Sequence, residues 1–247
     1  MSKNEEVQGA RQLIRAIGAR RIAILATGVV VLLGAAIVVT ATLASRPQRL
    51  PFLSPEELAK ASQAVGFTPS NTVEMGLVEL LPANASLPKP SPGLLPVGSK
   101  APDFELQTAT GESVKLSSLR GKTVLLEFSA TWCPHCQAEA PFITRIHESL
   151  PAQGFTVLAV NVDSEDPASV YAFDTYYHVP YQTLLDPGGR PGSFTSPGTA
   201  GRVTRAYRVS ILPAFYIIDP RGRIAWRADG EQPTVLIVQE LSKASGP

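Results

Sequence analysis

The chain has 247 residues, of which 44% are hydrophobic and 17% charged, and its formal net charge is +1. This balance is that of a globular protein, and without a basic patch it gives no reason to expect nucleic acid as a partner. Two cysteines are too few for a stapling disulfide framework, so in an oxidising compartment they indicate a working pair rather than a structural one.

An uncharged apolar run occupies residues 22–44. As a helix it would be about 35 Å long, enough to cross a bilayer core of about 30 Å. The apolar region of a signal peptide has only about 7–15 residues, so we expect an uncleaved transmembrane helix that contacts the lipid bilayer, although Thr42-Leu43-Ala44 would also serve as a cleavage site. More basic residues precede the run (Lys3, Arg11, Arg15, Arg20, Arg21) than follow it (Arg46, Arg49, Lys60). The positive-inside rule therefore predicts a single-pass protein with residues 1–21 as a cytoplasmic tail and the remainder outside.

Residues 45–97 contain nine prolines, which disfavour long regular elements, and we expect a Pro-rich stalk or linker here. A short helix is expected at residues 54–65, with Ser54 as its cap and Pro55 in the first helical position. The alternative that residues 66–81 fold onto the following domain as an extra strand stays open.

Residues 98–247 have the size of one domain. The strands expected in chain order are 104–106, 113–116, 123–129, 155–162, 181–185, 214–219 and 223–226. The helices expected are 134–150, 167–178, capped by Asp166, and 233–244, with Val235, Leu236, Val238 and Leu241 buried. The runs 123–129 and 155–162 are almost wholly apolar, as is typical of central parallel strands covered on both faces. This alternation predicts a three-layer α/β domain with a mixed central sheet.

The only cysteines, Cys133 and Cys136, stand three residues apart where an apolar strand gives way to a helix. At this spacing they can form a disulfide within one helical turn, and the N-terminus of the helix favours the thiolate. Zinc sites use the same spacing but need further ligands, and the chain has no other cysteine. We therefore expect neither a metal site nor a cofactor.

Residues 122–136, followed by Glu139, closely resemble the active-site segment of the thioredoxin superfamily, and residues 101–104 and 116–122 resemble its redoxin branch. With its expected anchor and stalk, the chain resembles the membrane-anchored ResA/TlpA-type thiol–disulfide oxidoreductases. The resemblance covers about residues 98–247. It implies a thioredoxin-like fold, a place at the bacterial cell membrane, and protein thiols or disulfides as substrates, with apocytochrome c as a candidate. A membrane electron-donor thiol–disulfide protein is the implied partner.

The resemblance also implies roles for single residues. Cys133, next to Trp132, is expected to be the exposed nucleophile, and Cys136 to resolve the mixed disulfide. Glu127 matches the buried acid that relays a proton from the resolving cysteine; the alternative is a sheet residue in a salt bridge at the rim. Pro213 matches the superfamily's cis-proline, which would expose the backbone of the preceding residue, Leu212, for pairing with a substrate strand.

Pro134 and His135 between the cysteines are expected to set the redox potential, since a histidine there stabilises the thiolate and makes the disulfide more oxidising. The same pair occurs in DsbA-like oxidases, so the direction of electron flow stays open. Glu139 matches the acidic residue of the motif C-x-x-C-x-x-E and either tunes the thiols or is a solvated carboxylate near the helix N-terminus.

Two other functions remain as alternatives. A redoxin-fold copper protein would use thiolates and imidazole, which suit Cu(I), but the cysteine spacing is narrower than in such proteins. A peroxidase shares the upstream redoxin segment but frames its cysteine with proline and threonine, whereas residues 129–132 are Ser-Ala-Thr-Trp.

Overall fold

The structure, a computed structural model, describes residues 53–69, 93–150, 154–162, 166–189 and 200–245. The described residues belong to one compact unit. Within the described ranges, no helix has the length and apolar character needed to cross a membrane. The expected transmembrane helix at 22–44 and the tail before it lie outside these ranges, so both stay predictions.

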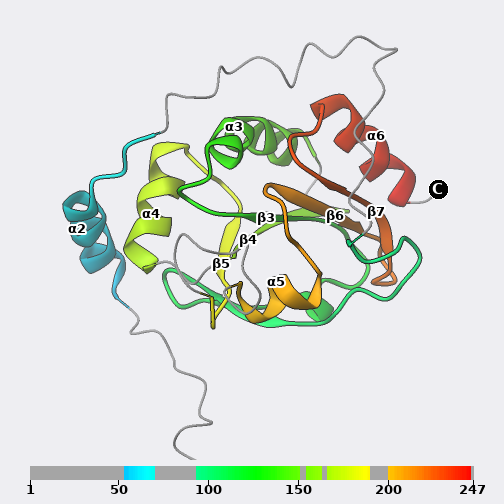
Figure 1. The fold of residues 1–247 in the computed structure, drawn as a ribbon, viewed down its shortest axis with the longest axis horizontal. Coiled ribbons are helices and arrows are strands. Elements are labelled where there is room, and N and C mark those ends of the chain that lie inside the picture. The colour runs from blue at the N-terminus through cyan, green and yellow to red at the C-terminus, as the bar shows by residue number, and fades with distance from the viewer. Residues whose placement is uncertain (1–52, 70–92, 151–153, 163–165, 190–199, 246–247) are drawn as a thin grey trace, which may run out of the picture. The chain divides into compact units, whose positions relative to one another are not determined.

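Seven strands of the described residues form a single mixed sheet in the order β2-β1-β5-β4-β3-β6-β7 (Figure 1). They are β1 (Glu105–Thr108), β2 (Ser113–Lys115), β3 (Thr123–Ser129), β4 (Phe155–Asn161), β5 (Gln182–Leu185), β6 (Ala214–Ile218) and β7 (Ile224–Asp229). Strands β3, β4 and β5 are parallel, and the other pairs are antiparallel. Every residue of β3 is buried, as its apolar sequence predicts for a central strand.

Helices cover both faces of this sheet. They are α2 (Pro55–Val65), α3 (Pro134–Ser149), α4 (Pro167–Tyr176), α5 (Arg202–Ala206) and α6 (Thr234–Ala244), with a 3-10 turn η1 (Leu116–Leu119). Helices α3, α4 and α6 lie on one face and α5 on the other (Figure 1). The predicted three-layer α/β arrangement is confirmed, and α5 and η1 are short elements that the sequence pattern did not indicate.

The side chains of β3 alternate between two hydrophobic cores. Leu125 packs with Ile143 of α3, whereas Phe128 packs with Tyr207, which follows α5. Because alternate residues of a strand point to opposite faces, Glu127 shares the face of Leu125. The strand therefore directs the Glu127 carboxyl beneath the helix that carries the two cysteines.

The C-terminal helix differs from expectation in its buried face. Val235, expected in the core, is 64% exposed, and the helix buries Ile237, which was not expected, together with Leu241, which was. Four consecutive apolar residues left the phase of this helix undetermined in the sequence. Residues 237 and 241 are one helical turn apart and share a stripe, from which residue 235 is rotated by about 200°.

Parts of residues 45–97, the expected stalk, belong to the compact unit. Helix α2 forms with the predicted Ser54 cap, and the following Phe67 contacts Phe173 of α4, with ring centroids 5.6 Å apart. Leu94 is 2% exposed and joins the core on the α5 side of the sheet. These portions therefore pack against the domain through apolar side chains, and the stalk or linker over the rest of residues 45–97 stays a prediction.

A buried carboxylate holds α5 against the end of β5. Asp186 is fully buried, and its oxygens accept hydrogen bonds from the backbone N–H groups of Val203 (2.9 Å) and Thr204 (2.7 Å) and from the Thr204 hydroxyl (2.7 Å). These bonds satisfy donors in the first turn of a short helix that has no side-chain cap of its own.

Replacing Asp186 with Ala should lower the free energy of unfolding by about 2–3 kcal/mol, because three buried donors lose their acceptor. Urea unfolding followed by circular dichroism measures the change. Asp166→Ala is the matched control: Asp166 precedes α4 without capping it through its side chain, and should cost less than about 0.5 kcal/mol. Equal losses in the two variants would contradict the role of Asp186.

Candidate active site

The two cysteines lie at the start of α3, directly beyond β3. Cys133 is the N-cap residue of the helix, and its Sγ accepts a hydrogen bond from the backbone N–H of Cys136 at 3.3 Å. Pro134 occupies the first helical position, where its missing N–H leaves no partner unsatisfied. Both cysteines are free thiols, so the structure shows the reduced state of the pair.

The surroundings separate the pKa values of the two thiols. A hydrogen bond from the Cys136 thiol, then the Cys136 backbone N–H and the His135 imidazole, lower the pKa of Cys133 against the opposing effect of burial. Burial, followed by the neighbouring Cys133 and the charge of Glu127, raises the pKa of Cys136 well above its ordinary value. When the pair loses one proton, the negative charge therefore lies on Cys133 and the remaining proton on Cys136.

The nucleophile is less accessible than expected. Cys133 is only 4% exposed, against 1% for Cys136, so the expectation of an exposed nucleophile is wrong. The reason is tertiary packing, since Cys133 joins the same core cluster as Leu212 and Ala214. Trp132 stands beside it at the surface and is 39% exposed. Little of Cys133 is therefore accessible to a substrate sulfur, and the exposed indole marks the surface next to it.

The Leu212–Pro213 peptide bond is cis, as the resemblance implied. The bond precedes β6, whose first residue, Ala214, pairs with Phe128 near the end of β3. This register places Pro213 near the end of β3 from which the chain continues to Cys133. Leu212 is 8% exposed, and its expected role in binding a substrate strand stays a prediction.

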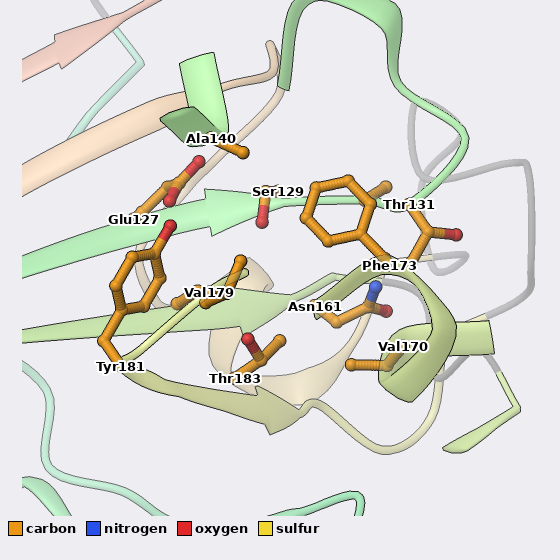
Figure 2. Close-up of a pocket in the computed structure, with 12 residues that line it drawn as sticks. Glu127, Ser129, Thr131, Ala140, Asn161, Val170, Phe173, Val179, Tyr181 and Thr183 are labelled. Atoms are coloured by element: carbon orange, nitrogen blue, oxygen red, sulfur yellow. The ribbon is translucent and has the colours of Figure 1, made fainter. Parts of the chain in front are cut away.

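Glu127 is 3% exposed, and its carboxyl lies in the middle of the protein. Burial, followed by the negative charges of Cys133 and Asp174, raises its pKa to about 8. It forms no ion pair with any residue that the structure describes, so the alternative of a salt bridge at the rim is wrong. Figure 2 shows the Tyr181 hydroxyl directed toward this carboxyl. A carboxyl that titrates near neutral pH beside Cys136 is suited to exchange a proton with it.

Glu139 is fully buried, which excludes the solvated carboxylate as its description. Neither of its carboxyl oxygens accepts a hydrogen bond of ordinary geometry. Burial and the charge of Glu127 raise its pKa to about 9, although the nearby backbone N–H of Gln232 acts in the opposite direction. The spacing to Cys136 and Ile143 on the buried stripe of α3 would have predicted this burial.

His135 points to solvent and contacts a residue that no sequence pattern identifies. Its Nδ1 lies 2.5 Å from Oε1 of Glu231, in the connection between β7 and α6. The two residues are 96 positions apart, and no pattern around Glu231 marks it. The contact fixes the imidazole beside Cys133 and adds a negative charge to its surroundings.

A groove of about 360 Å³ lies beside Trp132. One side is formed by the active-site loop, where the Gln137 side-chain amide donates to the Thr131 carbonyl at 2.7 Å. The other includes Phe67 and Thr68, which follow α2. The segment before the predicted domain therefore shapes the surface next to the cysteines, which no sequence motif indicated.

No three His, Cys, Asp or Glu side chains converge on a possible metal position in the described part of the chain. His135 directs one ring nitrogen to Glu231. A copper site at Cys133 and Cys136 would therefore need a ligand from elsewhere.

Glu139→Gln should flatten the pH dependence of stability. A carboxyl whose pKa rises from 4.5 to about 9 on folding binds its proton more tightly in the native state, so stability falls as pH rises from about 5 to 9. In the variant this fall should be smaller by on the order of 1–3 kcal/mol. Urea unfolding at several pH values measures it, and Glu148→Gln, an exposed change on the same helix, should leave the profile unaltered. A wild-type profile retained in Glu139→Gln would contradict the burial argument.

Comparison with known proteins supports the resemblance. The thiol-disulfide oxidoreductase ResA of Bacillus subtilis (strain 168) is 35% identical over 127 residues, covering 51% of this chain and 64% of that protein, which is less than two thirds of its length. ResA of Bacillus thuringiensis subsp. konkukian (strain 97-27) is 27% identical over 147 residues, covering 60% of this chain and 78% of that protein.

Comparison with solved structures also supports the resemblance. A proposed thiol:disulfide interchange protein DsbE from Chlorobium tepidum superimposes with a TM-score of 0.53 at 30% identity, covering 62% of this chain and 99% of that one. A proposed protein disulfide isomerase from Bacteroides thetaiotaomicron gives 0.51 at 27% identity, with 62% and 92% covered. The AhpC/TSA family model matches residues 97–227, more than half of the sequence, and the chain therefore belongs to the AhpC/TSA family, within the redoxin branch of the thioredoxin superfamily.

Proposed function

We propose that this protein is a thiol–disulfide oxidoreductase that exchanges disulfides with protein substrates through Cys133 and Cys136. The observation that carries the proposal is the opposite environment of two thiols one helical turn apart. Cys133 accepts an N–H hydrogen bond at the helix N-terminus, whereas Cys136 is buried next to an acid. This asymmetry gives one thiol the role of nucleophile and the other that of a protonated resolving group.

In the reductive direction, the Cys133 thiolate attacks one sulfur of a substrate disulfide. The S–S bond breaks, and the departing substrate sulfur takes up a proton. Cys136 then passes its proton to the Glu127 carboxylate, and the resulting thiolate attacks Cys133 Sγ and releases the second substrate sulfur. Two electrons have moved to the substrate, and Cys133 and Cys136 are left as a disulfide. The reverse sequence oxidises a substrate dithiol.

The cellular setting is part of the proposal. An apolar run at 22–44 preceded by basic residues favours a membrane anchor with the catalytic domain outside the cytoplasm. The relatives named ResA and DsbE favour envelope protein disulfides as substrates, with apocytochrome c as the first candidate. A second thiol–disulfide protein in the membrane would return electrons to the pair.

Disulfide formation is the second candidate function, and the position of His135 favours it. The imidazole lowers the pKa of Cys133, and a stabilised thiolate makes the disulfide more oxidising. A reduction potential close to about −270 mV, the thioredoxin value, would exclude a strong oxidase.

Cys136→Ser should trap substrates, because the nucleophile remains and the resolving thiol is gone. Expressed as the full chain in its host, the variant should accumulate covalent adducts on Cys133 several-fold above wild type. Non-reducing electrophoresis and mass spectrometry detect them, and a reductant should release them.

Cys133→Ser is the matched control and should trap nothing, because Cys136 is buried and protonated. Adducts on Cys136 in that control would reverse the two roles. If Cys136→Ser traps nothing while wild type reduces insulin, the assignment of nucleophile and resolving cysteine is wrong.

His135→Ala should raise the pKa of Cys133, since the imidazole lowers it. The disulfide should become less oxidising by roughly 10–30 mV, because 30 mV corresponds to about 1.4 kcal/mol for two electrons. Alkylation rates across pH and equilibration with glutathione measure the two effects. His147→Ala, near the far end of α3, should change neither, and an unaltered potential in His135→Ala would remove the histidine from the redox argument.

A further inference from the structure

A row of three residues crosses the sheet beside the active site. Glu127 on β3 pairs with Ala159 on β4, which pairs with Thr183 on β5. Paired residues share a face, so all three side chains point to the layer of α3 and α4. Adjacent strands are about 4.8 Å apart, which puts the outer two about 10 Å from each other. The methyl group of Ala159 leaves the space between them open.

A cavity occupies that space. Its polar lining includes Glu127, Tyr181 and Thr183, and its apolar lining includes Ala159 and Phe173 (Figure 2). The volume is about 10 Å³, close to the ~10–15 Å³ that one water molecule requires. The Glu127 carboxyl therefore faces a small chamber, which Ala130 and Thr131 of the segment before Cys133 also line.

A second, wider groove of about 340 Å³ adjoins the cavity, and Val179, Tyr181 and Thr183 line both. Asp174 of α4 lines only the groove. The Thr183 hydroxyl donates to Asp174 Oδ1 at 2.9 Å. The Thr183 hydroxyl thus lies between the enclosed chamber and the Asp174 carboxylate, which lines the outer groove.

The charges around Asp174 suit it to proton exchange. Burial raises its pKa to about 7, with the Thr183 hydrogen bond acting in the opposite direction. The titratable groups near it are Tyr171 on α4, Glu112 after β1, Tyr181 before β5 and Glu127 on β3. None of the described residues lining the groove is basic. The pKa of Asp174 is thus about 7 and that of Glu127 about 8. The Thr183 hydroxyl and the chamber lie between these two carboxyls.

We propose that Thr183 and Asp174 relay the proton of Cys136 from Glu127 to solvent, through the chamber left open by Ala159. The relay rests on the proposed function, since it serves the resolving step of disulfide exchange. When Cys136 has protonated Glu127, this proton passes to a water molecule in the chamber and to the Thr183 oxygen, while the Thr183 hydroxyl proton passes to Asp174. Asp174 releases its proton to the groove, and no bond to sulfur changes in these transfers.

The test uses the Thr183→Val and Thr183→Ser pair, which differ in the hydroxyl. Mixing the reduced protein with excess dithionitrobenzoate releases one thionitrobenzoate when Cys133 attacks and a second when Cys136 resolves the mixed disulfide. Thr183→Val should slow the second release about tenfold near pH 7, within the ~10²–10⁴-fold that positioned proton transfer supplies. Thr183→Ser should stay within about twofold of wild type. The first release should be unchanged in both.

Two more variants keep the proposal falsifiable if Thr183→Val does not fold. Ala159→Val fills the chamber and should slow the second release as Thr183→Val does. Glu112→Gln is the control, since this exposed carboxyl lines the groove without a hydrogen bond to Thr183, and it should behave as wild type.

The outcomes distinguish a failure of the proton relay from a failure of the proposed oxidoreductase activity. A second release as fast as wild type in Thr183→Val or Ala159→Val, with Glu127→Gln slow, overturns the relay and leaves the oxidoreductase standing. A wild-type protein that releases no second thionitrobenzoate fails the proposed function, and the relay fails with it. Equal slowing in Thr183→Ser and Thr183→Val also overturns the relay, since the hydroxyl is then not the cause.

Discussion

Beneath the start of α3, Cys136, Glu127 and Glu139 lie in surroundings where a negative charge is unfavourable. Burial is the first cause of the raised pKa of each. The charge that the pair carries is therefore driven to Cys133, where backbone N–H groups of the helix N-terminus receive it. The two thiols are chemically identical. The difference in their burial and hydrogen bonding therefore distinguishes the nucleophile from the resolving group.

This arrangement depends on the sheet. Glu127 reaches the cysteines because β3 is central and the alternation of its side chains directs residue 127 to the face under α3. A buried carboxyl without an ion pair destabilises the native state, and proteins retain such groups mainly where function requires them. Glu139, buried with no ordinary hydrogen bond, adds to the same destabilisation from the helix side.

Local patterns carried most of what the sequence could predict. The central strands, the helix after Cys133, the Ser54 cap and the position of Pro213 each follow from short runs of residues. Where the outcome depended on partners distant in the chain, prediction failed or was silent. The 4% exposure of Cys133 arises from packing against residues about 80 positions later, and Glu231 meets His135 across 96 positions. In α6 the prediction of the buried face failed for a local reason, because four successive apolar residues are compatible with several rotations of the helix about its axis.

The side of Glu127 from which its proton leaves has a consequence for the reaction. During the resolving step, Cys133 is joined to the substrate, and the surface beside Trp132 is covered by a protein. A proton released from Glu127 toward the cysteines would have to pass this contact while the bound substrate excludes water from the contact surface. The chamber beside Ala159 lies between β3 and β5, and the groove that adjoins it has neither Trp132 nor a cysteine among the described residues that line it. A buried acid can therefore serve a site that each substrate closes, provided that its proton leaves through the groove lined by Asp174 and Thr183.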